Sequence, residues 1–187
     1  MSKLINEYDY FYNLSEDEQV KELYAQFGLC VYWFQVLEHQ LIDMIILSAQ
    51  KNGLILSSAD FDNLFYSFSD KSMGMLKKKV FELYDLSEKD IGEINNIQAK
   101  RNYYVHNYFK NHSEDFFDIT KKLQMLSEFI DTAEQIRSVD KKLENLCNNS
   151  LEKIGITQDI LDSLLLAIKN GNFESDDNLK FGKRNKT

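Results

Sequence analysis

The sequence predicts an all-α protein, folded as an up-and-down bundle of about five to six helices. The chain of 187 residues has no proline and only 7 glycines, so it lacks the usual turn signals of β-hairpins and long loops. Its apolar residues recur instead every three or four positions over long stretches, the spacing that gives a helix one apolar face. With a hydrophobic content of 43%, the chain can bury a core of its own.

The first long helix is expected to run to residue 51, after an N-terminal arm of residues 1–14. Ser15 and Glu18 have the spacing of a capping box, which marks a helix start. Apolar residues then follow at helical spacing: Val20, Tyr24, Phe27, Val31, Phe34, Leu37, Leu41 and Ile45. An Asn-Gly pair at 52–53 is a typical helix stop.

Further helices follow the same pattern of an N-cap and an apolar stripe. They are expected over residues 59–68 (capped by Ser57 or Ser58), 71–86, 88–111 (capped by Ser87), 113–146 and 158–169 (capped by Thr157). Residues 171–187 are polar and aperiodic, and we expect a disordered tail. Residues 15–170 are thus predicted to form a single domain.

Cysteine usage and hydropathy predict a cytoplasmic protein. Cys30 and Cys147 lie far apart without metal-ligand spacing, so neither a disulfide nor a metal site is expected. The N-terminus has no basic stretch followed by an apolar one, and hence no secretory signal. The most apolar stretch, residues 27–47, contains Glu38 and Asp43, so no membrane span is expected.

The charge distribution is uneven. A net charge of −8 argues against a general polyanion binder. Residues 97–112, however, contain Lys100, Arg101 and Lys110 and no acid, and the rest of the chain has 19 basic and 30 acidic residues. Such a basic window could admit an RNA phosphate locally, although an acid-free window of this length also arises easily by chance.

Arg101 occupies an unusual position in the helix predicted over residues 88–111. On an ideal helix it lies within about 40° of four apolar residues, Ile94, Ile97, Val105 and Tyr108. A buried guanidinium costs several kcal/mol unless it is paired. Arg101 should therefore meet a carboxylate (Glu38 and Glu93 are candidates), a bound phosphate or a hydrated interface.

Asn102 and His106 are four residues apart and so lie on one flank of the same helix. His106 lies about 140° from Arg101 on an ideal helix, too far for both to hold one atom directly. Cooperation between them needs the reach of the arginine, a helix irregularity or a second copy of the chain.

The pattern Arg101-Asn102-x-x-x-His106 resembles the R-x4–6-H signature of the HEPN superfamily. Its continuation to Tyr108 looks like the R-x4-H-x-Y form of HEPN toxins that pair with a minimal nucleotidyltransferase antitoxin. The resemblance covers roughly residues 15–147. It implies a metal-independent endoribonuclease without a cofactor, or an RNA- or nucleotide-binding relative, and a homodimer whose two motifs form a composite site.

The implied reaction is attack of an RNA 2′-hydroxyl on the adjacent phosphate, giving a 2′,3′-cyclic phosphate and a 5′-hydroxyl. His106 would take or return the proton, and Arg101 would hold the phosphate. Asn102 would orient His106 or bind a phosphate oxygen. Lys100 and Lys110 are candidate substrate-binding residues from the basic window.

Three tyrosines have open roles. Tyr103 and Tyr104 could stack on RNA bases or pack at the dimer seam. Tyr108 matches the position that accepts AMP in the toxins, but its place on the apolar stripe favours core packing. His39 and His112 have no assigned role.

Two other classes of function compete with the ribonuclease. In a non-catalytic binding module, Arg101 would grip RNA, a nucleotide or a protein partner without cleavage, which the acidic net charge favours slightly. In a helical scaffold, Arg101 would be salt-bridged within the core.

Overall fold

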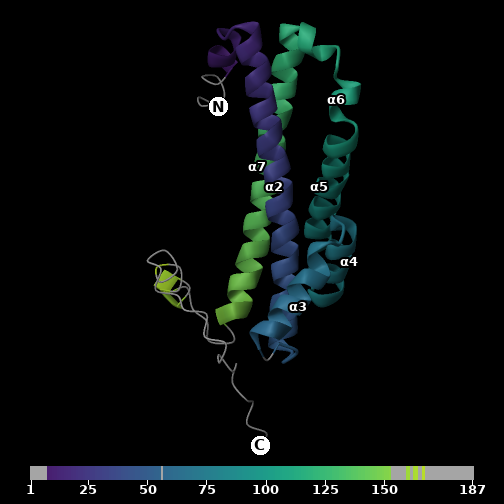
Figure 1. Ribbon diagram of the computed structural model, residues 1–187, viewed down its shortest axis with the longest axis vertical. Coiled ribbons are helices and arrows are strands. Elements are labelled where there is room, and N and C mark those ends of the chain that lie inside the picture. The colour runs from purple at the N-terminus through teal and green to yellow at the C-terminus, as the bar shows by residue number, and fades with distance from the viewer. Residues whose placement is uncertain (1–7, 56, 153–158, 161, 164–165, 167–187) are drawn as a thin grey trace, which may run out of the picture. The chain divides into compact units, whose positions relative to one another are not determined.

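The computed structural model describes residues 8–55, 57–152, 159–160, 162–163 and 166. The elements are α2 (Glu16–Lys51), α3 (Ser58–Ser69), α4 (Met73–Leu83), α5 (Glu88–His106), α6 (Tyr108–Asn111), the 3₁₀ helix η1 (Asp115–Phe117) and α7 (Ile119–Glu152) (Figure 1). These described elements include no strand, so the all-α helical fold is confirmed. None of the described helices is long and apolar enough to cross a membrane.

The chain divides into two compact units. The first contains residues 8–37 and 87–140, and the second contains the described residues within 38–86 and 141–166. Because α2 and α7 contribute to both units, neither unit is a continuous segment of the chain. A single domain over residues 15–170 stays a prediction.

In the first unit, α5 runs antiparallel to the neighbouring parts of α2 and α7 (Figure 1). Its core is aromatic and draws one ring from each helix. The ring centres of Phe27 and Tyr104 are 5.8 Å apart, those of Tyr104 and Phe129 5.8 Å, and those of Phe27 and Phe129 5.7 Å. The Cys30 thiol also donates to the Phe129 carbonyl, at 3.0 Å. These contacts hold α5 between its two neighbours.

The second unit packs α3 and α4 with the later parts of α2 and α7. The Tyr84 hydroxyl donates to the Met44 carbonyl at 2.8 Å, which ties the end of α4 to α2. The Gln40 amide lies 3.3 Å from the Cys147 sulfur, and Cys30 and Cys147 are both free and buried. Gly53 has φ +72°, which confirms the Asn-Gly pair as the stop of α2.

The predicted caps are largely confirmed. The Ser57 hydroxyl accepts from the Asp60 N–H at 3.2 Å, so Ser57 caps α3. At the start of α2, the Glu18 carboxylate accepts from both the Ser15 N–H, at 3.0 Å, and the Ser15 hydroxyl, at 2.6 Å. These bonds satisfy groups that a helix start leaves without partners.

Ser87→Ala is expected to destabilise the protein by about 0.5–2 kcal/mol, because the Ser87 hydroxyl accepts from the Asp90 N–H at 3.2 Å and caps α5. Ser72→Ala is the matched control. Ser72 precedes α4 with nearly the same backbone angles, but its side chain makes no cap hydrogen bond. Urea unfolding of both variants gives the comparison, and equal losses would contradict a capping role.

The helix predicted over residues 88–111 is confirmed as far as His106 but is interrupted once, at Asn107. It stops at His106, because Asn107 leaves helical geometry (φ −133°, ψ −18°), and the short α6 follows. The helix predicted from Ser113 also begins later. Asp118 accepts from the backbone N–H groups of Thr120 and Lys121, at 2.7 and 3.1 Å, and these bonds start α7 at Ile119.

The ends of the chain are described only in part. Residues 8–12 of the predicted arm are helical, and Phe11 is fully buried. The arm therefore packs into the body at this point. Residues 1–7, most of the helix predicted over 158–169 and the tail 171–187 lie outside the described residues.

Candidate functional site

The predicted motif lies in the last two turns of α5. Arg101 is half-buried, whereas Asn102 and His106 are both exposed. Within the described residues, the side chains of Asn102 and His106 form no hydrogen bond, so both are available to a ligand or a second chain. Their spacing of one helical turn makes them neighbours on the surface.

The apolar face of α5 is rotated from its predicted position. Val105, expected inside, is 45% exposed, and Tyr104 is buried in its place together with Ile94 and Ile97. On an ideal helix Arg101 lies between the buried Ile94 and Ile97, and its own side chain is half-buried.

The two candidate lysines are placed differently. The Lys100 ammonium donates to Thr132 Oγ1 at 3.3 Å and to Gln135 Oε1 at 2.9 Å, so it points toward α7. On the helix this direction is away from His106, and the structure does not bring Lys100 to the motif. Lys110 is exposed on α6.

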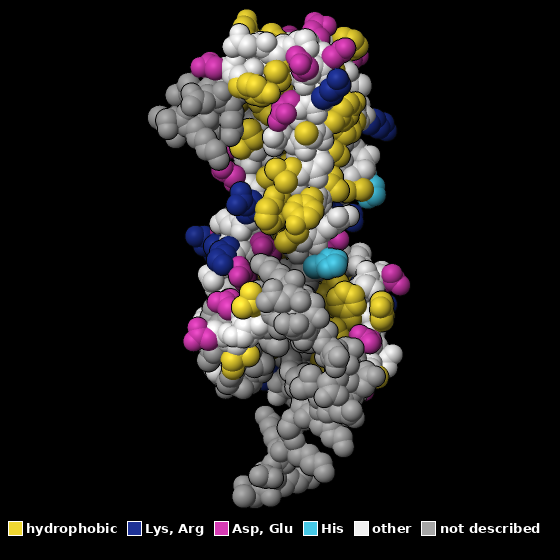
Figure 2. Space-filling view, turned by 60° about the vertical axis from the view of Figure 1, so that its left-hand side comes forward, with side chains coloured by type: hydrophobic (Ala, Val, Ile, Leu, Met, Phe, Trp, Pro, Cys, Tyr) yellow, Lys and Arg dark blue, Asp and Glu magenta, His cyan; other side chains and the backbone are white. Residues whose placement is uncertain are grey.

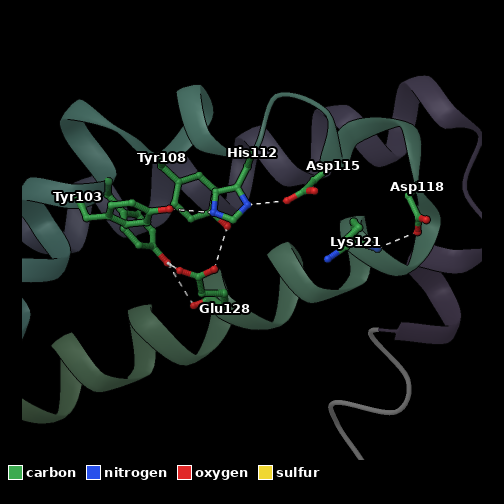
Figure 3. Close-up of polar contacts among 8 residues, drawn as sticks. Tyr103, Tyr108, His112, Asp115, Asp118, Lys121 and Glu128 are labelled. Atoms are coloured by element: carbon green, nitrogen blue, oxygen red, sulfur yellow. Dashed lines mark hydrogen bonds and ion pairs between the residues drawn. The ribbon is translucent and has the colours of Figure 1, made fainter.

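Tyr104 and Tyr108 are core residues. Tyr104 is 2% exposed and Tyr108 0%. The Glu128 carboxylate of α7 accepts from the Tyr104 hydroxyl at 3.2 Å. It also accepts from the Tyr108 hydroxyl at 3.1 Å (Figure 3). Their burial favours packing over base stacking for Tyr104, and packing over modification for Tyr108.

Burial raises the pKa of the Tyr104 and Tyr108 hydroxyls well above the ordinary value, and the nearby charge of Glu128 raises it further. In the unfolded chain a tyrosine releases its proton near pH 10. Above that pH the folded state still holds protons that the unfolded state has lost, so stability falls as pH rises.

Tyr108→Phe is therefore expected to weaken this alkaline loss of stability. The measurement is the urea midpoint of wild type and variant at pH 8, 9, 10 and 11. Tyr10→Phe is the control, because Tyr10 is 63% exposed. An unchanged pH slope in Tyr108→Phe would contradict the assignment.

A second polar cluster surrounds His112, which had no role in the sequence analysis. Its Nε2 lies 2.9 Å from the Tyr103 hydroxyl, and its Nδ1 lies 2.6 Å from Asp115 Oδ2 (Figure 3). Its ring stacks on Tyr108, with centres 4.4 Å apart. The i,i+3 spacing of His112 and Asp115 was the one available sequence signal. That spacing alone does not reveal Tyr103 as a third member, because the break at Asn107 brings Tyr103 to His112.

The molecular surface carries charges of both signs. On the face in Figure 2, basic side chains are interspersed with acidic ones and form no single large patch. A depression of about 220 Å³ between α5 and α7 is lined by Glu93, Asn96, Ile97, Gln135, Ser138 and Val139, on the side of α5 away from His106. No group of three or more metal-ligating side chains occurs within the described ranges.

Comparison of the chain with protein-family models, curated proteins and solved structures gives no match. The HEPN resemblance therefore stays a prediction that depends on residues 101–108 and their helical context.

Proposed function

We propose that the protein is a HEPN-type, metal-independent endoribonuclease that acts in the cytoplasm as a toxin or phage-defence effector. One observation carries the proposal. Asn102 and His106 are exposed one turn apart at the end of α5, next to the half-buried Arg101. Within the described chain the side chains of Asn102 and His106 bond to no other residue, which argues against a purely structural use of either.

The proposed chemistry assigns one task to each side chain. His106 accepts the proton of the RNA 2′-hydroxyl, which then attacks the adjacent phosphorus. The Arg101 guanidinium holds the phosphate and offsets its growing negative charge. Asn102 orients His106 or donates to a phosphate oxygen. The products are a 2′,3′-cyclic phosphate and a 5′-hydroxyl.

A second copy of the chain is part of the proposal, and the two motifs would build one composite site. The exposed face of α5 supports it, because it offers a run of uncharged side chains around the motif. They are Gly92, Asn95, Ala99, Asn102 and Val105. Such a face approaches its copy without charge repulsion. A nucleotidyltransferase-type antitoxin is a further proposed partner.

The test is incubation of the purified protein with total RNA in EDTA, followed by analysis of the new RNA ends. Cleavage to 2′,3′-cyclic phosphate and 5′-hydroxyl ends is expected. RNA that stays intact with correctly folded protein would contradict the proposal.

The alternative is a non-catalytic HEPN-like module that binds RNA, a nucleotide or a protein partner. The net charge of −8 and the mixed surface charges favour it, because an efficient ribonuclease must attract a polyanion. In that case RNA is bound but not cut, and Arg101→Ala abolishes the binding in a titration.

A further inference from the structure

Tyr103 links the motif to the His112 cluster. It lies on α5 between Asn102 and His106, and residues three apart on a helix have Cβ atoms about 5–6 Å apart. Its hydroxyl lies 2.9 Å from His112 Nε2. Tyr103 thus belongs to the helix end that carries His106 and also to a cluster built from α6, η1 and the turn between them.

The cluster has the order carboxylate, imidazole, hydroxyl. Asp115 Oδ2 lies 2.6 Å from His112 Nδ1, and the side chains of His112 and Asp115 are 26% and 27% exposed. A proton on Nδ1 that bonds to Asp115 fixes the ring so that Nε2 faces Tyr103. The Tyr108 ring lies against the imidazole, and the Tyr108 hydroxyl is bonded to Glu128 of α7 (Figure 3).

The proposed ribonuclease reaction needs a second proton transfer. When His106 takes the 2′-hydroxyl proton, the 5′-oxygen on the other side of phosphorus must leave, and it leaves best with a proton. Arg101 does not release protons in proteins, and the amide of Asn102 is no acid. Lys100 points toward α7. The Tyr104 hydroxyl is buried and donates to Glu128. Tyr103 is then the remaining hydroxyl donor among the motif residues and their neighbours on α5.

We propose that Tyr103 donates its hydroxyl proton to the leaving 5′-oxygen, and that His112, held by Asp115, replaces that proton. The inference rests on the proposed ribonuclease function. In the step, the bond from O2′ to phosphorus forms and the bond from phosphorus to O5′ breaks. The 2′ proton moves to His106, the Tyr103 proton moves to O5′, and the Nε2 proton of doubly protonated His112 moves to Tyr103. His106 ends protonated and His112 neutral, so charge is conserved.

A competing interpretation is that the cluster only fixes the segment after α6 to α5. The two interpretations differ when the leaving group needs no proton. A thiolate leaves without a general acid, so a 5′-bridging sulfur removes the need for Tyr103 but not the need for His106.

The experiment uses the purified full chain and an RNA oligonucleotide that contains the linkage cut in total RNA, made with oxygen or with sulfur at the 5′-bridging position. The Tyr103→Phe variant is expected to cleave the oxygen linkage about 10²-fold or more slowly than wild type. It should cleave the sulfur linkage at nearly the wild-type rate. His112→Asn should show the same pattern. His106→Ala should be slow on both linkages.

The outcomes separate the two proposals. If Tyr103→Phe lowers the cleavage rate equally on both linkages, or on neither, the role of Tyr103 is overturned and the proposed ribonuclease function stands. Wild-type protein that cuts neither linkage, nor total RNA, overturns the ribonuclease and this inference with it. A near-wild-type cleavage rate of the Tyr103→Phe variant on the sulfur linkage supports the inference, because a structural defect would slow cleavage of both linkages.

Discussion

His106→Ala is expected to lower the rate of RNA cleavage by roughly 10²–10⁴-fold, the usual contribution of a general base. His106 is exposed at the end of α5, and its side chain forms no hydrogen bond with another described residue. Its removal should therefore leave the fold intact, so a lost activity would report on chemistry. The measurement is the initial rate on total RNA in EDTA, with the melting temperature as a check on folding.

His39→Ala is the matched control for this variant. His39 is also an exposed helical histidine, on α2, and its ring lies 6.4 Å from that of Phe65. It should retain wild-type activity. Equal rates for wild type and His106→Ala would remove the catalytic claim and leave the binding module as the better description.

Phe129→Ala is expected to destabilise the first unit by about 3–5 kcal/mol, because a large cavity forms where three helices meet. Phe129 is 0% exposed, and its ring contacts those of Phe27, Tyr104 and Tyr108. Loss of these contacts also loosens the packing that positions α5. Urea unfolding monitored by circular dichroism measures the effect.

Phe117→Ala is the control for residue type. Phe117 is 91% exposed on η1, so its removal should change stability by less than about 0.5 kcal/mol. A small effect of Phe129→Ala, similar to that of Phe117→Ala, would contradict the assigned core.

Helix existence and several boundaries could be predicted because they depend on neighbouring residues. The stop of α2 needs only a glycine that accepts a positive φ, and the caps at Ser57 and Ser87 need only a backbone N–H three residues ahead. The exposed pair Asn102 and His106 also follows from one-turn spacing. All of these are short-range effects.

The residue at which α5 ends and the residue at which α7 begins could not be predicted in the same way. The stretch from residue 107 to residue 118 contains no proline or glycine, so local propensity allows the helix to continue. The break at Asn107 accompanies the burial of Tyr108, whose hydroxyl reaches Glu128 on α7. This contact joins residues 20 positions apart, and a local pattern does not contain it.

The sequence by itself determined an all-α chain, its main helices and a candidate motif at residues 101–106, because amphipathic spacing and caps act within a few residues. Only the tertiary structure decided which side of α5 is buried, where Lys100 points, and that Tyr103, His112 and Asp115 meet. The physical reason is that these contacts arise between elements after the chain turns. Packing and hydrogen bonding between the two elements determine which side chains meet, and the neighbouring residues in the sequence do not.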